Sequence, residues 1–194
     1  MTRSQDTSRT LRITPRAAAL TLSSGQGPLR AEWRGPAPRV RDRGGVTEIG
    51  YGLLGRVRML VTRRSSLALK LAPRIPLDLE IAGGVSGLRA DLRELDIRSL
   101  TISGGANDVL MDLPAPAHEL PVRIEGGASR TVVRRPTQAP VSVEIDGGAS
   151  GLRIDEERLG AIGGHVTRHA GAGAASVRLR VLGGAAGLSV AAAP

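Results

Sequence analysis

The chain has 194 residues, with no cysteine, no phenylalanine, one tryptophan and one tyrosine. The lack of cysteine excludes disulfide bonds, thiolate metal ligands and a cysteine nucleophile. Val, Leu, Ile and Ala must therefore fill the core, which suits a narrow interior. The net charge of +9 is uneven, because residues 1–74 carry 15 basic and 4 acidic residues and residues 75–194 carry 12 and 14. Such a basic half attracts nucleic acid, anionic lipid or an acidic protein, although a solvated Arg-rich surface gives the same pattern.

Residues 1–10 are mostly polar, and we expect them to form a disordered tail. Neither they nor any later segment contains an apolar run long enough for a signal-peptide core or for the roughly 20 residues of a membrane span. The sequence therefore predicts a cytoplasmic protein without a membrane span.

Residues 11–76 resemble irregular first turns of a repeat array. The segment 11–33 has the alternation of two or three strands, with a Gly-rich bend at 24–28. The segment GGVTEIGYGLL at 44–54 contains a Gly pair followed by alternating apolar residues. We expect residues 11–194 to form a single domain in which 11–76 are degenerate, basic rungs.

Four arginines cluster within GRVRMLVTRRSS, in this basic part of the chain. These candidate anion-binding residues are Arg56, Arg58, Arg63 and Arg64. Phosphate contacts would make binding fall steeply with salt. With so few aromatic residues for base stacking, sequence-specific recognition of single strands is disfavoured.

From residue 77 onward the chain repeats an apolar residue, any residue, Gly-Gly and an alternating run. The Gly pairs begin at positions 83, 104, 126, 147 and 183, so the steps are 21, 22, 21 and 36 residues. The long step equals one repeat plus an insertion near 156–176. Apolar residues stand four and two positions before each pair, and mainly apolar ones five and seven positions after it.

Strict alternation is typical of strands, whose successive side chains point to opposite faces. Each repeat thus has two short strands around a Gly-Gly corner, where glycine permits positive φ and close backbone approach. Matching residue types at matching positions favour stacking of one repeat on the next rather than a β-meander. The fold expected is an all-β solenoid with rungs of about 21 residues.

The C-terminal rung, RVLGGAAGLSVAAAP, has no helix or charged segment to cap it. Exposed solenoid ends need caps, because they leave core side chains and backbone groups unpaired. One hypothesis is a homodimer in which two C-terminal rungs meet through Val181, Leu188 and Val190. The alternative is that the insertion at 156–176 folds over the end.

The phrases PLDLEIAGGVSGLRADLREL, SLTISGGANDVLMDLPAP, PVRIEGGASRTVVRRP and PVSVEIDGGASGLRIDEERLGAIGGH together identify a resemblance. They resemble the putative-adhesin-type β-solenoids and the related toast-rack domains, a family of uncharacterised bacterial proteins. The resemblance covers roughly residues 75–190 and, more loosely, 11–74. It implies a single-stranded right-handed β-helix without established catalytic residues.

Residues with catalytic or metal-binding chemistry are sparse. His165 and His169 lie four apart in the Gly-rich insertion without an obvious third ligand, and His118 sits in a variable bend. Acidic residues recur as a column at Asp91, Asp112 and Asp155. A glycosidase would need paired carboxylates in an aromatic-lined groove, so we interpret this column as structural.

The sequence therefore predicts no catalytic, cofactor-binding or metal-binding residues. The function we expect is that of a non-enzymatic scaffold, which binds a protein partner through the solenoid surface. The alternative is binding of nucleic acid or acidic lipid through the basic N-terminal half.

Overall fold

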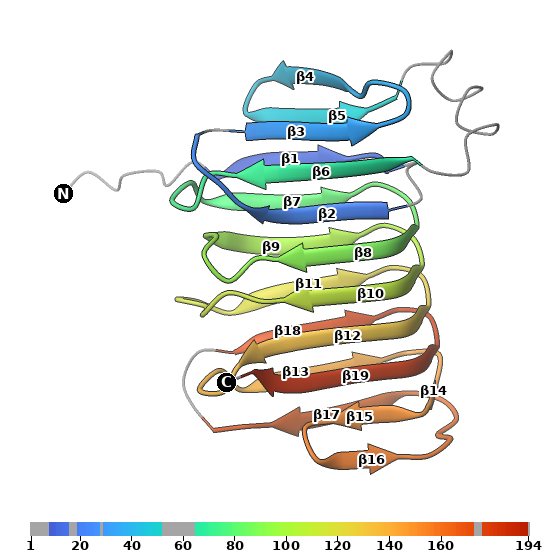
Figure 1. Ribbon diagram of the computed structural model, residues 1–194. Helices are drawn as coiled ribbons and strands as arrows, with labels where there is room; N and C mark the ends of the chain where they lie inside the picture. Colours follow the sequence, from blue (N-terminus) through green and yellow to red (C-terminus); the bar gives the residue numbers. More distant parts are fainter. Residues whose placement is uncertain (1–7, 16–18, 28, 52–64, 173–175, 194) are drawn as a thin grey trace.

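The computed structural model shows two long β-sheets facing each other (Figure 1). The structure describes residues 8–15, 19–27, 29–51, 65–172 and 176–193. Every regular element among them is a strand, and within these ranges no helix is long and apolar enough to cross a membrane. The prediction of an all-β fold is confirmed.

The first sheet, sheet A, has nine strands. In spatial order these are β17 (Val166–Ala170), β13 (Val141–Ile145), β18 (Val177–Val181), β11 (Leu120–Ile124), β9 (Ile97–Ile102), β7 (Leu77–Ile81), β1 (Arg9–Ile13), β5 (Val46–Gly50) and β4 (Arg39–Arg43). Its pairings are parallel except at the two ends, where β4 pairs antiparallel with β5 and β17 with β13.

The second sheet, sheet B, is built in the same way. Its order is β16 (Glu157–Leu159), β15 (Leu152–Ile154), β19 (Ala185–Ala193), β12 (Ala128–Pro136), β10 (Ala106–Asp112), β8 (Val85–Asp91), β2 (Ala19–Ser24), β6 (Ser66–Leu71) and β3 (Leu29–Arg34), and β14 (Ala149–Ser150) also pairs with β19. The end strands β3 and β16 are again antiparallel to their neighbours. Both sheets are therefore mixed.

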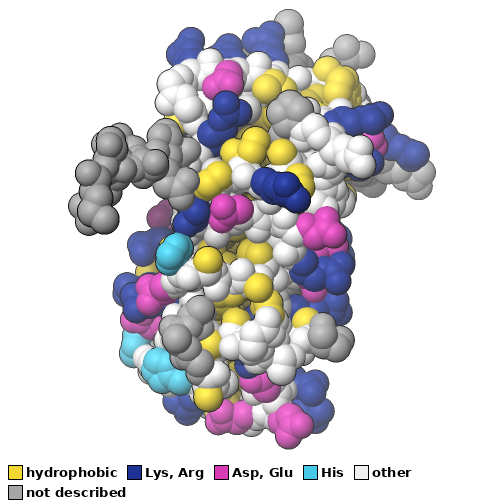
Figure 2. All heavy atoms as spheres, turned by 90° about the vertical axis from the view of Figure 1, so that its left-hand side faces the viewer, with side chains coloured by type: hydrophobic (Ala, Val, Ile, Leu, Met, Phe, Trp, Pro, Cys, Tyr) yellow, Lys and Arg dark blue, Asp and Glu magenta, His cyan; other side chains and the backbone are white. Residues whose placement is uncertain are grey.

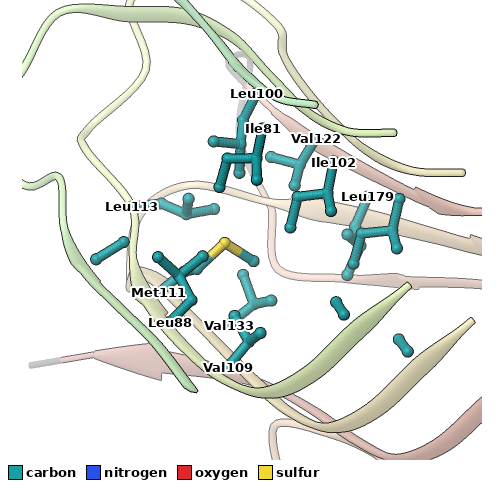
Figure 3. Close-up of a cluster of buried hydrophobic side chains, with 14 of the residues drawn as sticks. Ile81, Leu88, Leu100, Ile102, Val109, Met111, Leu113, Val122, Val133 and Leu179 are labelled. Carbon is teal, nitrogen blue, oxygen red and sulfur yellow. The ribbon is translucent and has the colours of Figure 1, made fainter. Parts of the chain in front are cut away.

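The core lies between the two sheets and is almost entirely aliphatic. In Figure 3, Leu100, Ile102 and Val122 from sheet A face Val109 and Met111 from sheet B. All five side chains are at most 2% exposed. Along most of each regular strand, side chains alternate between this layer and the outer face, so the period of two observed in the sequence is mainly the period of burial.

The predicted register of the repeats is confirmed. Leu79 pairs with Leu100, and Leu100 with Val122, in sheet A. In sheet B, Val109 lies between Leu88 and Thr131. Each rung thus contributes one strand to each sheet, and equivalent residues stack in columns.

The glycine corners are explained mainly by close approach of neighbouring rungs. A Cβ atom on Gly104 would lie 2.5 Å from the backbone nitrogen of Gly84, and one on Gly126 would lie 2.6 Å from that of Gly105. The positive φ also expected at the corners occurs at Gly83 and Gly148 but at neither Gly104 nor Gly126. Here glycine is needed because no side chain fits, not because of its φ angle.

The spatial order of the rungs differs from their order in the chain at both ends. The rung β18–β19 lies between β11–β12 and β13–β15, and β1–β2 lies between β5–β6 and β7–β8. The repeat pattern could not reveal this, because Leu179 continues the column equally well beside Val122 or Val143. The antiparallel strands at each end complete the stack around the inserted rung.

The expectation that the C-terminal rung ends the solenoid is wrong. Val181, Leu188 and Val190 have no exposed surface, because a rung stacks on each side of them. They offer no face to a second copy. The insertion does cover an end, as the alternative expected, but it covers the end formed by β13 and β15.

The remaining expectations concern the path of the chain. Strand β1 begins at Arg9, inside the tail expected at 1–10. The described strands within residues 11–76 join the same two sheets as the regular rungs. The right-handed sense of winding stays a prediction.

Candidate interaction surfaces

The two sheets end together at strands β3 and β4, which we call the open end. Among the described residues, each of these strands pairs on one side only, β3 with β6 and β4 with β5. A short loop at 35–38 connects them, and its two prolines (Pro36 and Pro38) and Gly35 favour a turn over a further strand. One hairpin-like segment thus supplies the last strand of both sheets (Figure 1).

Inward-facing side chains at the open end are mainly apolar. Trp33 is paired with Leu67, and Val40 with Ile49, so both point toward the core side of their sheets. Yet Trp33 is 47% exposed and Val40 is 52% exposed, and they are the exposed large hydrophobic residues of the described part of the chain. The core therefore reaches the surface at this end.

A pocket of about 200 Å³ lies beside Val40. Val40 and Asp42 line it from β4, Leu29 from β3, and Leu71 and Leu77 from the neighbouring strands. Its lining is mostly apolar, and it also includes Arg9, Asp42 and two threonines. It suits a single bulky apolar side chain.

The opposite end, formed by β16 and β17, is closed by charge. Arg168 is paired with Val143 and Glu157 with Ile154, so both charged residues take inward-facing positions. Arg168 Nε lies 3.9 Å from Glu157 Oε1, and this ion pair joins the two sheets. Inward-pointing charge is a common means of preventing association at a sheet edge.

The open end is also the basic end of the molecule. In Figure 2, Lys and Arg side chains gather at its top, and Asp and Glu become more frequent toward its bottom. Residues 29–43 contain five arginines and two acidic residues. Of these arginines, Arg39, Arg41 and Arg43 point outward from β4, where every residue is exposed.

A shallow trough follows the Gly-Gly corners along the stack. It has a volume of about 820 Å³ and is lined by glycine, alanine and small polar residues, including Ser86, Asn107 and Ser129. Ile162 and Gly163 from the insertion line it near β14. Asn107 donates a hydrogen bond to Ser86 at 3.2 Å and accepts one from Arg130 at 3.0 Å. These polar side chains along the trough are therefore hydrogen-bonded to one another.

A cluster of Glu144, Asp146 and His165 lies on the outer face of sheet A. Their potential ligand atoms lie within 4.8 Å of one another. The Arg180 guanidinium lies 3.7 Å from Glu144 and 3.3 Å from Asp146. Because Arg180 and His165 each already lie against both carboxylates, the arrangement is explained as an ion-pair network.

The other residues with metal-binding or acidic side chains do not assemble into a site. His165 directly precedes β17 and His169 lies four residues further along it, about 13 Å at the usual rise per strand residue, so the two cannot share an ion. His118 is exposed in a bend. In the acidic column Asp91 pairs with Asp112, but the neighbour of Arg134 on the far side is Ala191 and not Asp155.

Asp155 instead binds a buried arginine that sequence reasoning missed. Arg135 is 2% exposed, and its Nη2 atom donates to Asp155 at 2.5 Å while Nη1 donates to the Ala139 carbonyl at 2.8 Å. The alternation of β12 already places Arg135 in the inward phase after Val133. The burial of Arg135 could therefore have been predicted from this alternation in the sequence.

The predicted anion-binding arginines, Arg56, Arg58, Arg63 and Arg64, lie outside the described residues. Anion binding through them stays a prediction. The open end, which sequence reasoning did not single out, could have been suspected from the lone tryptophan and the alternation of arginine in RVRDR.

These features define the molecule as an all-β repeat protein of two mixed sheets with unlike ends. Residues 55–134 match the family model described as the N-terminal domain of toast_rack, DUF2154. A similar solved structure is the crystal structure of "a putative cell adhesion protein" from Clostridium sporogenes. It is 16% identical, with a TM-score of 0.71, and the match covers 96% of this chain and 93% of that chain. No curated protein matches in sequence.

The two findings confirm the resemblance stated from the sequence. The family model supports the toast-rack part of that resemblance over residues 55–134, and the structural neighbour supports the fold. At 16% identity the neighbour shows the fold alone. Function must be argued from the surfaces of this chain.

Proposed function

We propose that this protein is a non-enzymatic scaffold that binds a protein partner through its open end. The observation that carries the proposal is the exposure of Trp33 and Val40 where the two sheets stop. The opposite end carries the Arg168–Glu157 pair in the equivalent place. The contrast supports an interaction surface at one end and a closed cap at the other.

The chemistry of the open end suits a protein interface. Tryptophan and arginine are enriched among the residues that dominate binding energy, and such anchors fill pockets at the centre of an interface. Here the exposed Trp33, an apolar pocket lined by Val40 and the exposed arginines of β4 all lie at the same end of the molecule. Covering Trp33 and Val40 would also remove apolar surface from water, which stabilises a complex.

Replacing Trp33 tests the proposal. The tagged protein is purified from its native cells, and co-purifying proteins are compared among wild type, Trp33→Ser and the matched variant Leu159→Ser at the closed end. Loss of a hot-spot residue typically costs 2 kcal/mol or more, roughly a thirtyfold loss in affinity. We expect Trp33→Ser to lose the partner and Leu159→Ser to retain it. Equal retention by both variants would contradict the proposal.

The second candidate function is binding of an anionic polymer or surface, through the basic half of the chain. The exposed arginines of β4 favour it, together with Arg56, Arg58, Arg63 and Arg64. A mobility-shift assay with duplex DNA and flotation with acidic vesicles, each at low and moderate salt, test it. Binding at low salt that falls steeply with added salt is the expected result. No binding at low salt removes this candidate.

The cytoplasmic location predicted from the sequence is part of the proposal. Cell fractionation with an antibody to the protein tests it, and recovery with the envelope would overturn it.

A further inference from the structure

We propose that strand β4 accepts an added strand from an acidic, extended segment of the partner. The segment carries acidic residues at alternate positions, facing Arg39, Arg41 and Arg43. This inference rests on the proposed function, because it names the kind of segment that the open end binds.

Strand β4 has the backbone of an acceptor. It pairs with β5 only, in regular antiparallel register from Arg39 opposite Gly50 to Arg43 opposite Val46. All five of its residues are exposed, so no other described segment covers its outer edge. An edge strand leaves a row of N–H and C=O groups unpaired, which is the basis of recognition by strand addition.

A column of alternating charge crosses the outer face of sheet A and stops at β4. Glu80, Arg12 and Glu48 occupy successive strands in register, and Arg41 follows Glu48 on β4. Arg12 lies 2.9 Å from Glu80 and 3.3 Å from Glu48. The hydrogen bond to Glu80 is the main cause that raises the pKa of Arg12 above its ordinary value. The column therefore ends on a cation, and the next strand position fits an anion.

Two more arginines of β4 also favour acidic residues on the added strand. Arg39 and Arg43 lie two residues on either side of Arg41 and share its outward face. An added strand presents alternate side chains to that face, so its acidic residues would recur with the same period. Opposite charges directly across paired strands stabilise the pairing.

The inner face of β4 specifies the residues in between. Val40 and Asp42 point inward and line the apolar pocket. The intervening residues of the added strand would point the same way, toward Val40 and the exposed Trp33. The segment that fits therefore alternates acidic and β-branched or other apolar residues.

Two other occupants fit less well. A second copy pairing β4 with β4 antiparallel would set Arg39, Arg41 and Arg43 against the same arginines, and like charges across strands are destabilising. A nucleic acid needs a continuous basic surface, whereas Glu48, opposite Arg41, and Glu80 further along interrupt the outward face of sheet A. Neither occupant would place acidic side chains opposite the alternating arginines of β4.

Short peptides binding to the full chain test the inference, with affinity followed by fluorescence anisotropy. The probe is TEVEIET, and its isomer TEEEVIT has the same composition without the alternation. We expect TEVEIET to bind at least about tenfold more tightly than TEEEVIT and to weaken with added salt. Equal affinities, or full displacement of TEVEIET by an equal charge of duplex DNA, would overturn strand addition in favour of a polyanion site.

Charge reversal and backbone methylation identify the contacts. The triple variant Arg39→Glu, Arg41→Glu, Arg43→Glu should bind TEVEIET about tenfold or more weakly than wild type does. It should also bind the cationic peptide TKVKIKT more tightly than wild type does. The matched control Arg158→Glu, on the edge strand of the closed end, should bind TEVEIET as wild type does. Methylating the amides of one alternate set of probe residues should abolish binding, while methylating the other set should not. Indifference to both sets would overturn the main-chain pairing.

The test separates this inference from the proposed function. If TEVEIET fails to bind while Trp33→Ser still loses the cellular partner, the inference of an added acidic strand is wrong. The proposal that the open end binds a partner is then retained. Sedimentation of the protein alone tests whether a second copy of the chain occupies the edge of β4. A dimer that the triple arginine variant dissociates would overturn the inference and assign the edge to self-pairing.

Discussion

One residue in each repeat has a left-handed backbone. It stands four positions after the first glycine of the pair, and φ is 72° at Gly87, 52° at Asp108, 46° at Arg130, 63° at Gly151 and 67° at Gly187. This residue explains why two inward side chains, such as Val85 and Leu88, lie three residues apart instead of two. Three rungs use glycine there, and two impose the conformation on a residue with a Cβ.

The first prediction concerns that position. Residues other than glycine in the left-handed region cost roughly 1 kcal/mol or more. Arg130→Gly should therefore unfold with a free energy about 1 kcal/mol higher than Arg130→Ala, since both variants lose the same contact with Asn107. Denaturant unfolding of the two variants measures the difference. Equal stability would contradict the left-handed assignment.

Tyr51 gives a prediction about pH. It is 7% exposed, and burial raises the pKa of its phenol above the ordinary value of 10.0. Because folding favours the neutral phenol, its contribution to stability is complete below about pH 10 and is lost as pH rises toward the folded pKa. It is the one tyrosine of the chain, so tyrosinate absorbance titrates it alone.

Two results are expected from that titration. The phenol of the folded protein should titrate above pH 10, and Tyr51→Phe should remove part of the alkaline decline in the free energy of unfolding. A folded-state titration at or below the ordinary value would show that the side chain is solvated.

At the scale of the element, the Gly-Gly corners set the distance between rungs. A Cβ on Gly104 would meet the backbone of the neighbouring rung at 2.5 Å, whereas a Cβ on Gly105 would approach the Gly127 carbonyl oxygen at an ordinary 3.5 Å. Neither residue has a positive φ. The two adjacent glycines therefore differ in available space alone.

This difference makes a matched pair of variants. Gly104→Ala should be destabilised by about 1–3 kcal/mol more than Gly105→Ala, because overpacking a tight backbone contact forces a shift of the rung. Thermal unfolding of both proteins measures the gap. If Gly105→Ala were the less stable of the two, the stacking geometry at the corner would be wrong.

The predictability of these elements follows from what a repeat encodes. Alternation and the Gly pairs predicted which side chains are buried, as Leu88 and Ile102 show, because burial depends on the period alone. They could not predict which rung neighbours which, because the columns are interchangeable. Asp155 illustrates the result: it was assigned to the acidic column, but it binds Arg135 across an inserted rung.

The interaction surface was missed for a related reason. Trp33 and Val40 are in positions that look like core positions in the sequence, and they are exposed only because the sheets stop there. Where a stack ends is a property of the whole arrangement. A local pattern carries no information about it.

At the scale of the molecule, engineered disulfides test the order of the rungs. The chain has no cysteine, so any intramolecular disulfide that forms must join the two introduced cysteines. Arg123 pairs with Arg180 across β11 and β18, whereas Glu144 lies one strand further away. A disulfide spans Cα atoms about 4.4–6.8 Å apart, which adjacent strands satisfy and strands two apart, at roughly 9.5 Å, do not.

The expected outcome separates the observed order from the order of the chain. Arg123→Cys with Arg180→Cys should oxidise readily, and Arg123→Cys with Glu144→Cys should stay reduced, as electrophoresis without reductant would show. The reverse pattern would mean that the rungs stack in chain order.

The two ends of the stack differ in chemistry, and this asymmetry is the centre of the functional account. One end exposes Trp33 and Val40 beside three outward arginines, and the other is sealed by Arg168 and Glu157. An end-specific measurement in living cells tests it most directly. A photo-crosslinking amino acid replaces Trp33 in one variant and Leu159 in another, and adducts are compared after irradiation. The account predicts a discrete adduct with a protein partner from position 33 and none from position 159. Adducts of equal yield from both positions, or from position 159 alone, would contradict it.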